Sequence, residues 1–530
     1  MDTKALRQKI LDLAIRGKLV PQDPNDEPAS VLLERIREQK QQMLKEGKLK
    51  KKDIKNDSVI FVGEDNLHYE KFADRTVKCI EDEIPFDVPE GWEWARIGSV
   101  CIINPRNNIS DSLDVSFIPM PLISEGYANT HSYEIRTWNK VKNGFTHFAE
   151  NDIGIAKITP CFENRKSVIF KDLVNGYGAG TTELHILRTL DNTIANEYLL
   201  WIAKMDSFIQ GGIHSFSGAV GQQRVGKDYL SQYLIPIPPR NEQIRIIQKI
   251  NLIFKFVIAI ENEKRDLEEI IQQAKSKILD LAIRGKLVSQ DPTDEPAFVL
   301  LERIRTEKEE LIKKGKIKRD KKESIIFKAE DNSYYETVAG NTVCLDNELP
   351  FQLPEGWVWS RLQNISSVLT DGTHKTPIYS NDGYVFLSSK NVTTGKIDWD
   401  NVMYISEELH EELYKRLAPM PGDILLAKNG TTGVAALVDK NIVFDIYVSL
   451  ALIRITKKII EPQYILYIIG SSYIQEYFNK SLKGIGVPNL HLEHIRKTLI
   501  PIPPYAEQIR IIECTSKISD MIEKISEALL

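Results

Sequence analysis

Residues 241–286 read NEQIRIIQKINLIFKFVIAIENEKRDLEEIIQQAKSKILDLAIRGK, and the rest of the chain can be organised around them. The stretch follows a proline-rich IPIPP run and reaches a glycine at position 285. Its apolar residues recur at alternating steps of four and three, which is the spacing of a coiled-coil seam. The seam holds one charged residue, Lys264, among Ile246, Ile250, Ile253, Val257, Ile260, Leu267, Ile271, Ala274, Ile278 and Leu281. We therefore expect one long amphipathic helix that is buried against another helix.

An internal repeat runs through the whole chain of 530 residues. Four motifs occur twice in the same order: KILDLAIRGKLV at 9–20 and 277–288, QDPNDEPASVLLERIR at 22–37 and QDPTDEPAFVLLERIR at 290–305, PFDVPEGWEW at 85–94 and PFQLPEGWVW at 350–359, and LIPIPPRNEQIRII at 234–247 and LIPIPPYAEQIRII at 499–512. Between the last two motifs the halves differ almost throughout. The chain is thus a tandem duplication in which a common frame holds two different inserts.

The two ends of the chain provide a partner for the long helix. The second copy of its sequence stops where Leu530 aligns with Arg265, and the first residues of the chain begin near the position of Glu269. We expect the two terminal helices to dock end to end and to pair with the central helix, antiparallel, about a pseudo-two-fold axis. The seam positions carried over are Ile511, Ile518, Ile522, Ile525 and Leu529, followed by Leu6, Ile10 and Leu13.

These patterns predict an α+β fold with two mixed α/β insert domains separated by a long antiparallel two-helix coiled coil. The expected segments are residues 1–20 (the first half of the split helix), 21–84 (a lead-in with a short helix and a basic loop), 85–237 (the first insert domain), 238–286 (the central helix), 287–349 (the second lead-in), 350–502 (the second insert domain) and 503–530 (the C-terminal helix). Further predicted helices cover 29–45, 297–314, 196–209 and 462–477, and predicted strands cover 152–158, 183–188, 423–428 and 447–455.

Composition restricts the class of protein. The formal net charge is -5, so a nucleic-acid partner would need a local basic surface rather than a basic chain. The five cysteines are odd in number and scattered, which argues against a disulfide framework or a zinc site. We expect a cytoplasmic protein, since the first residues do not read as a signal peptide and no apolar run is long enough to span a membrane.

Motifs for catalysis are missing from the sequence. GQQRVGK at 221–227 approaches a phosphate-binding loop, but Asp228 follows where the hydroxyl residue is required. There is no Asn/Asp-Pro-Pro-aromatic box for base methylation, no clustered carboxylates of nuclease type and no His/Cys ligand set for a metal. We therefore expect no catalytic centre and no cofactor in this chain.

The duplicated motifs and their cyclic order resemble the specificity subunit of Type I restriction–modification enzymes. The resemblance implies two target-recognition domains, each of which reads one half of a split, asymmetric double-stranded DNA target. It also implies a non-catalytic subunit that docks two methyltransferase subunits, which carry S-adenosylmethionine. Two restriction subunits that use ATP and magnesium are further possible partners. An alternative remains open: a coiled-coil interaction scaffold whose inserts bind protein or another ligand.

Candidate DNA contacts lie in polar loops of the inserts. AKITPCFENRK at 156–166 and AKNGTTG at 427–433 form one matched pair, SGAVGQQR at 217–224 and KGIGVPNL at 483–490 form a second, and DGTHKTP at 371–377 occurs in the second insert only. Lys and Arg suit phosphates, whereas amide, hydroxyl and guanidinium groups suit base edges. The candidates are Lys157, Asn164, Arg165, Lys166, Gln222, Gln223, Arg224, His374, Lys375, Lys428, Asn429, Thr431, Thr432 and Asn489. Ordinary hairpin turns and glycine loops would show the same composition.

Overall fold

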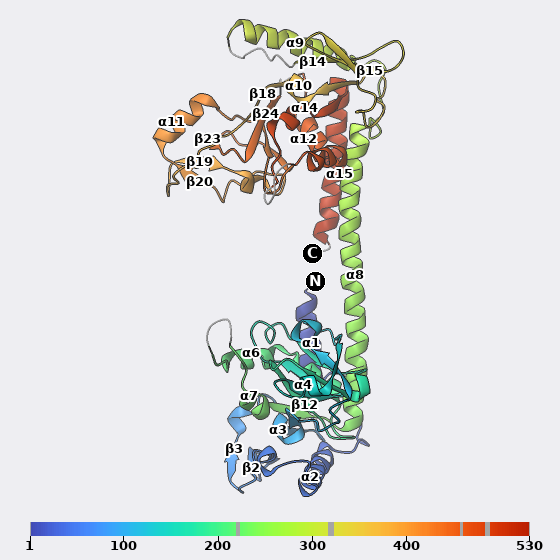
Figure 1. Cartoon of the computed structure of the whole chain (residues 1–530), viewed down its shortest axis with the longest axis vertical. Coiled ribbons are helices and arrows are strands. Elements are labelled where there is room, and N and C mark those ends of the chain that lie inside the picture. Colours follow the sequence, from blue (N-terminus) through green and yellow to red (C-terminus); the bar gives the residue numbers. More distant parts are fainter. Residues whose placement is uncertain (1, 219–222, 316–322, 456–458, 483–487, 529–530) are drawn as a thin grey trace. The chain divides into compact units, whose positions relative to one another are not determined.

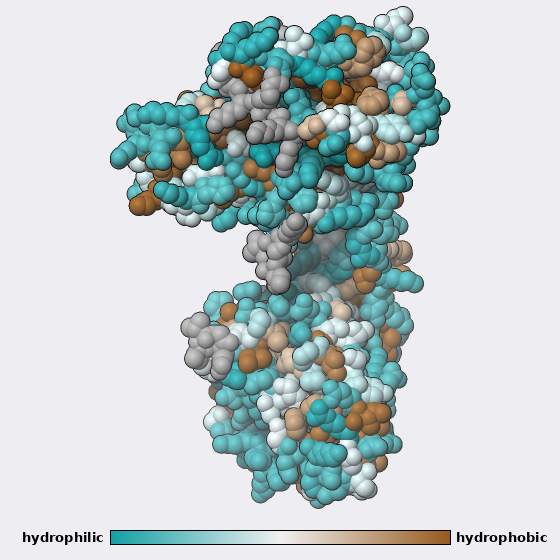
Figure 2. Space-filling model, turned by 45° about the horizontal axis from the view of Figure 1, so that its top comes forward, coloured by the Kyte–Doolittle hydropathy of each residue, from teal (hydrophilic) through white to brown (hydrophobic). Residues whose placement is uncertain are grey.

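The computed structural model describes residues 2–218, 223–315, 323–455, 459–482 and 488–528. The chain forms two compact units, Met1–Glu263 and Lys264–Leu530, which repeat one element order (Figure 1). Each unit combines helices with a mixed sheet structure, as the α+β prediction requires. The visible face of each unit is mainly hydrophilic, with hydrophobic residues in small groups (Figure 2). Within the described ranges, no helix has both the length and the apolar character needed to cross a membrane.

The predicted long helix is present as α8 (Arg240–Ile283), which contributes to both units. It begins directly after Pro239 and ends two residues before Gly285, whose φ of +64° favours glycine. A Cβ at Gly285 would lie 2.4 Å from Cγ of Pro354. Glycine is therefore required at this position both by the backbone conformation and by the close approach of the PEGW motif.

The buried face of α8 agrees with the predicted seam at Ile246, Ile250, Val257 and Ile271 and differs from it at Phe254 and Ile260. In unit 1 the buried residues are Ile246, Ile250, Phe254 and Val257, whereas Ile260 is 44% exposed. The steps of four, four and three follow the 3.6-residue period of a helix that packs on a globular domain rather than the 3.5-residue period of a coiled coil. The prediction is also wrong for Ile525 of the terminal helix, which is 51% exposed, and Leu529 lies outside the described residues.

Each unit contains its own antiparallel helix contact. In unit 1, Arg7 of α1 (Thr3–Ile15) donates two hydrogen bonds, of 2.6 and 2.8 Å, to the carboxylate of Glu261. This pair lowers the pKa of Glu261 to about 2. In unit 2, Ala282 and Ile283 at the end of α8 share a hydrophobic core with Ile511 of α15 (Tyr505–Ala528). The helices that were predicted at the two ends of the chain therefore exist, each packed against its own part of α8.

The lead-in segments form a helix and a small antiparallel sheet in each unit. The helices are α2 (Ala29–Lys45) and α9 (Ala297–Lys313), close to the predicted bounds. The sheet strands are β1 (Ser58–Val62), β2 (His68–Phe72) and β3 (Val77–Cys79) in unit 1, and β14 (Ser324–Lys328), β15 (Tyr334–Val338) and β16 (Asn341–Cys344) in unit 2. The repeated boxes also pair as strands, β4 (Glu93–Arg96) with β13 (Leu234–Ile237) and β17 (Val358–Arg361) with β25 (Leu499–Ile502).

The two insert domains share a strand order although their sequences differ. One sheet has the order β10-β9-β12-β5 in unit 1 and β22-β21-β24-β18 in unit 2. A second sheet has the order β7-β6-β11-β8 and β20-β19-β23, with a parallel pair in each case. The bounds in unit 1 are β5 (Ile102–Ile103), β6 (Asp114–Ile118), β7 (Glu134–Thr137), β8 (Thr146–Ala149), β9 (Ile153–Ala156), β10 (Ser167–Ile169), β11 (Tyr177–Gly180) and β12 (Leu184–Arg188). Those in unit 2 are β18 (Ser366–Asp371), β19 (Tyr384–Leu387), β20 (Met403–Ile405), β21 (Ile424–Ala427), β22 (Ala435–Leu437), β23 (Phe444–Ile446) and β24 (Leu450–Ile455).

The helical part of each insert is broken where one helix was predicted. Residues 196–209 fall in α5 (Asn196–Ala203) and α6 (Asp206–His214), because Met205 is extended with ψ of 147°. Residues 462–477 fall in α12 (Pro462–Gly470) and α13 (Ser472–Lys480), and Ser471 caps the second helix. The remaining helices are α3 (Ile97–Val100), α4 (Trp138–Val141), α7 (Lys227–Gln232), α10 (Leu362–Ile365), α11 (Glu407–Arg416) and α14 (Leu492–Lys497).

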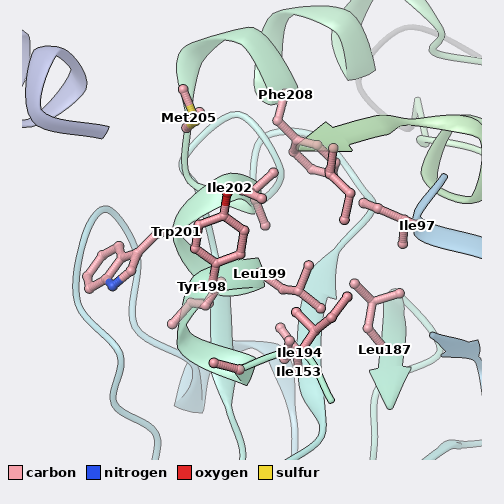
Figure 3. Packing of buried hydrophobic residues seen from close by; sticks show 14 of the residues in the cluster. Ile97, Ile153, Leu187, Ile194, Tyr198, Leu199, Trp201, Ile202, Met205 and Phe208 are labelled. Carbon is pink, nitrogen blue, oxygen red and sulfur yellow. The ribbon is translucent and has the colours of Figure 1, made fainter. Parts of the chain in front are cut away.

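The core of unit 1 joins the insert to the repeated frame. Tyr198, Leu199 and Ile202 of α5 pack with Ile153 and Leu187 of the first sheet (Figure 3). The same hydrophobic cluster includes buried residues of α1, α2 and α8. The insert therefore has a fixed base, and its variable loops project from a structure held by the frame.

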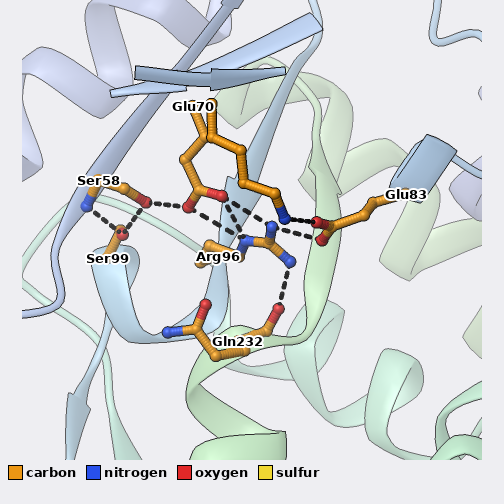
Figure 4. A network of polar contacts seen from close by, with 7 residues as sticks. Ser58, Glu70, Glu83, Arg96, Ser99 and Gln232 are labelled. Atoms are coloured by element: carbon orange, nitrogen blue, oxygen red, sulfur yellow. Dashed lines mark hydrogen bonds and ion pairs between the residues drawn. The ribbon is translucent and has the colours of Figure 1, made fainter. Parts of the chain in front are cut away.

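A buried ionic network supports the frame in each unit. Arg96 of β4 binds Glu70 at 2.8 Å and Glu83 at 2.7 Å, and donates to the backbone oxygen of Gln232 at 2.7 Å (Figure 4). In unit 2, Arg361 binds Glu336 at 2.7 Å and makes the equivalent bonds to Glu348 and to the oxygen of Lys497. Because the network is buried, removal of one partner would leave the other as an unpaired buried charge, which lowers the free energy of unfolding.

We expect Arg96→Met to lower the free energy of unfolding of unit 1 by about 3–5 kcal/mol, because Glu70 would keep a buried charge without its partner. Arg35→Met is the control, since the Arg35–Glu27 pair is 38% and 46% exposed and should contribute about 0–1 kcal/mol. Urea unfolding of the full chain, followed by circular dichroism, measures both. Equal effects of the two substitutions would contradict the role of the network.

Candidate DNA-binding surface

The described parts of the first two predicted loop segments are joined by a backbone bond in both units, while residues 219–222 and 483–487 lie outside the described residues. Lys157 follows β9 directly, and its backbone oxygen accepts a hydrogen bond of 2.9 Å from the backbone N–H of Val225. Lys428 follows β21, and its oxygen accepts one of 2.7 Å from Leu490. One matched backbone bond therefore joins the strand-end loop to the glycine loop in each insert domain.

The third segment of unit 2 joins the same cluster through a buried ion pair. Nζ of Lys428 lies 2.6 Å from Oδ2 of Asp371, which begins the DGTHKTP stretch. Arg416 of α11 donates to the backbone oxygens of Asp371 and Gly372. Ser389 donates to Oδ1 of Asn429 at 3.3 Å, which holds the AKNGTTG loop from its other side. Among the described residues of the second insert, Lys428 thus links the AKNGTTG loop to Asp371 through its side chain and to Leu490 through its backbone.

Burial separates the candidates of unit 2 into two groups. Lys428 is 5% exposed and its charge is neutralised by Asp371, so the phosphate contact predicted for it has no support in this arrangement. His374, Lys375 and Thr431 are exposed, and Asn429, Thr432 and Asn489 are half-buried. Nε2 of His374 lies 3.4 Å from Oδ1 of Asp371, so this exposed ring contacts the buried pair directly.

Among the described residues, Oδ1 of Asn489 is buried and has no hydrogen-bond partner.

Two predicted arginines of unit 1 hold loops together. Arg165 pairs with Asp206, and its Nε donates to the backbone oxygen of Lys204 at 3.1 Å. Arg224 forms a bidentate pair with Glu183, with two bonds of 2.9 Å. Both guanidinium groups are thus engaged within the domain, which limits their freedom to read bases.

The other candidates of unit 1 remain accessible to different degrees. Asn164 is exposed, and Lys157, Lys166 and Gln223 are half-buried. Gln222 lies outside the described residues. Gln223 belongs to the junction of the two loops, because its backbone oxygen accepts a hydrogen bond of 3.1 Å from the N–H of Thr159. The side chains of Asn164 and Lys166 instead contact Glu125 and the backbone oxygen of Met120.

Lys204 supports this loop cluster and was missed in the sequence. Its side chain is fully buried, and Nζ donates to the backbone oxygens of Gly126 and Arg165 at 2.7 and 3.1 Å. Burial, assisted by the charge of Arg165, lowers the pKa of Lys204 to about 7. A neutral amine has two N–H donors, which match these two acceptors. The only signal was a lysine in the otherwise apolar run LLWIAKM.

Gln8 of α1 links the frame to the same loop. Its amide nitrogen donates to the backbone oxygen of Lys204 at 3.0 Å and to Oη of Tyr127 at 2.7 Å, and its oxygen accepts from the N–H of Asp206 at 2.7 Å. The N-terminal helix therefore positions the loop that carries Arg165. Within the described ranges, no three His, Cys, Asp or Glu side chains are grouped as metal ligands.

We expect Lys204 to make the stability of unit 1 depend on pH. Between a folded pKa of about 7 and the ordinary value of 10.5, the unfolded chain binds a proton that the folded chain does not. The free energy of unfolding should therefore rise with pH across this window, by at most about 1.4 kcal/mol per pH unit. Below pH 7 the contribution of Lys204 to this free energy should not change with pH. Lys204→Met should remove this slope in urea unfolding at a series of pH values, and Lys227→Met at an exposed site should keep it. A slope unchanged in Lys204→Met would contradict the assignment.

Comparison with known proteins agrees with the resemblance seen in the sequence. The profile of a family described as "Type I restriction modification DNA specificity domain" matches residues 89–270 and 354–530. The EcoAI specificity subunit of Escherichia coli is 35% identical, over 98% of this chain and 89% of the relative. The EcoEI specificity subunit of Escherichia coli is 33% identical, over 99% and 90%.

A solved structure supports the fold. It comes from work on complex assembly and conformational transition of the type I R-M system, and it superimposes with a TM-score of 0.56 at 17% identity, over 84% of this chain and 94% of that chain. Two repeated frames, two differing loop clusters and the family match over both units lead to one assignment. The chain belongs to the specificity subunits of Type I restriction–modification systems, which are non-catalytic.

Proposed function

We propose that this chain recognises a bipartite, asymmetric double-stranded DNA target, with one half read by the loop cluster of each unit. The observation that supports this most is the contrast between frame and loops. Trp92 donates from Nε1 to Glu242 at 2.9 Å, and Trp357 donates to Glu507 at the same distance. Above these equal frames the loops differ in sequence and in their internal ion pairs. Two matching frames that carry different loops suit two insert domains that recognise different DNA half-sites.

The proposed coiled coil sets the distance between the half-sites. We assign it to α8 paired with α1 and α15, and the cyclic order of the repeats supports an end-to-end arrangement of the two terminal helices. The 44 residues of α8 correspond to roughly 66 Å at about 1.5 Å per residue. This exceeds one turn of DNA, about 34 Å, so a target with two half-sites and a spacer is geometrically reasonable.

The chain also acts, in this proposal, as a scaffold for two methyltransferase subunits. Leu252, Phe256 and Ile258 of α8 are 49–60% exposed, which is unusual for large apolar residues on one helix. Met521 takes the position of Phe256 when Glu507 is aligned with Glu242, and it is 55% exposed. Of these three positions, only that of Phe256 is apolar in both repeats, because Lys517 and Glu523 take the positions of Leu252 and Ile258. This one shared position is what favours a protein partner that binds twice.

In this proposal the partner subunits carry out the catalytic reactions. The methyltransferase subunits would supply S-adenosylmethionine, and restriction subunits, where they assemble, would use ATP and magnesium. We place the complex in the cytoplasm, because the five cysteines, all free thiols, suit a reducing compartment.

Exchange of residues 92–234 for the insert of another family member should change only one half of the methylated DNA site, because each unit holds its insert on its own frame. Methylome sequencing of cells that carry the hybrid measures both halves at once. Exchange of the equivalent segment, residues 357–499, is the matched control and should change the other half. Sites altered in both halves by either hybrid would contradict the proposal.

Lys375→Ala should weaken binding of the assembled complex to its DNA target several-fold at moderate salt and should reduce the slope of log affinity against log salt by about one. Lys375 is exposed beside His374 and above the buried Lys428–Asp371 pair, so the substitution leaves the fold intact. Lys480→Ala is the control, because this lysine is 80% exposed on α13, where it pairs with Glu476. Fluorescence anisotropy across a salt series measures both variants. A lack of salt-dependent DNA binding by the assembled complex would favour the alternative of a coiled-coil scaffold whose inserts bind protein or another ligand.

A further inference from the structure

Unit 1 contains an apolar groove of about 520 Å³ that neither the proposed DNA contact nor the helix pairing uses. It lies between α1, the repeated PFDVPEGW segment, β13 and the junction of α5 and α6. Ile202 and Met205, which are labelled among the buried residues in Figure 3, also form part of its wall. The frame, and not the variable loops, therefore provides most of this surface.

The floor of the groove is an aromatic pair that is present in both units. The ring centroids of Phe86 and Trp94 are 5.1 Å apart at 58°, and those of Phe351 and Trp359 are 5.1 Å apart at 51°. The guanidinium of Arg16 lies 4.3 Å from the ring of Phe86, and Arg284 makes the same contact with Phe351 at 4.5 Å. The two units thus carry the same aromatic platform.

The side chain that covers this platform differs between the units. In unit 2, the ring of Tyr473 lies 6.0 Å from Phe351 and 6.5 Å from Trp359. In unit 1, the equivalent residue is Ser207, which lines the open groove. The alignment is fixed by Tyr198 and Tyr464, which both donate to a backbone oxygen of the IPIPP strand. Unit 2 therefore shows what the unit 1 platform accepts, namely an aromatic ring.

The charges at the rim narrow the class of ligand. Asp12 binds Arg16 at 2.8 Å, and Asp206 binds Arg165. Each of these two carboxylates therefore already has a cationic partner within the chain. Lys9 is exposed at the rim and has no ion pair within the described chain. A small polar ligand would find few free partners here, whereas an aromatic residue next to a carboxylate would fit both the platform and Lys9.

We propose that the groove binds an aromatic side chain of the methyltransferase subunit, inserted where the ring of Tyr473 lies in unit 2. This rests on the proposed scaffolding function. The methyltransferase subunit is chosen as the partner because the proposed scaffolding function assigns it two sites on this chain, and the groove is lined mainly by the repeated frame. Buried aromatic anchors in pockets are the residues that contribute most to protein interfaces.

The test uses the full chain and its cognate methyltransferase subunit. Ser207→Tyr places the ring of unit 2 into the groove of unit 1 and should raise the methyltransferase concentration needed to half-fill one of the two sites by about tenfold or more. Lys9→Glu, at an exposed position, should weaken the same site several-fold. Lys277→Glu at the equivalent exposed position of unit 2 is the control and should leave both sites unchanged. Native mass spectrometry across a concentration series gives the two occupancies, and melting temperatures verify that each variant is folded.

The outcomes separate the groove from the wider function. The proposal would be overturned if folded Ser207→Tyr and Lys9→Glu both bound the methyltransferase with wild-type affinity. It would also be overturned if only binding of the restriction subunit were weakened. If the wild-type chain binds no methyltransferase, the scaffolding function itself fails, and the proposal for the groove fails with it. Weaker methyltransferase binding at one of the two sites in both variants, with the control unchanged, supports an aromatic anchor in unit 1.

Discussion

The carboxylate of Glu242, in the first turn of α8, holds unit 1 together. It accepts hydrogen bonds from Nε1 of Trp92 and from the side-chain amide of Gln22, so three segments far apart in the sequence meet at one buried group. Glu507 in unit 2 accepts the same two bonds. Burial raises the pKa of both carboxyl groups, and the hydrogen bonds oppose that rise. Because a buried carboxylate is costly without such donors, the frame tolerates little change here.

Sequence reasoning succeeded where the chain repeats a physical requirement. The long helix follows from its apolar period and from the proline and glycine at its ends. The short helices after the QDP motifs and the strand ends at Lys157 and Lys428 were predicted in the same way, once in each repeat. It failed where tertiary packing decides the outcome. Phe254 replaces Ile253 as a buried residue because its ring packs against Trp201 and Tyr127, which a heptad pattern does not include.

The candidate DNA contacts were chosen by polar composition, and their role in binding stays a prediction. The backbone bonds at Val225 and Leu490, which join two of the loops, are a finding of the structure that composition did not indicate. The role of a charged residue depends on its partner, and the partner is distant in the sequence. Lys428 and Asp371 are 57 positions apart, so nothing near Lys428 indicated that its charge would be buried and neutralised. Composition alone identifies a polar loop but does not separate the groups that face solvent from those that support them.

The bond between Gln22 and Glu242 spans 220 positions of the chain, and that between Gln290 and Glu507 spans 217. During synthesis, unit 1 can therefore complete its fold only after α8 has been made, because the first lead-in segment and α1 both contact α8. The second lead-in segment likewise requires α15. Such long-range closure slows folding and exposes apolar surface in the meantime. Since α8 completes unit 1 and then continues into unit 2, the ribosome delivers the last element of the first unit and the first element of the second as one uninterrupted helix. The order of folding is thereby built into the order of translation.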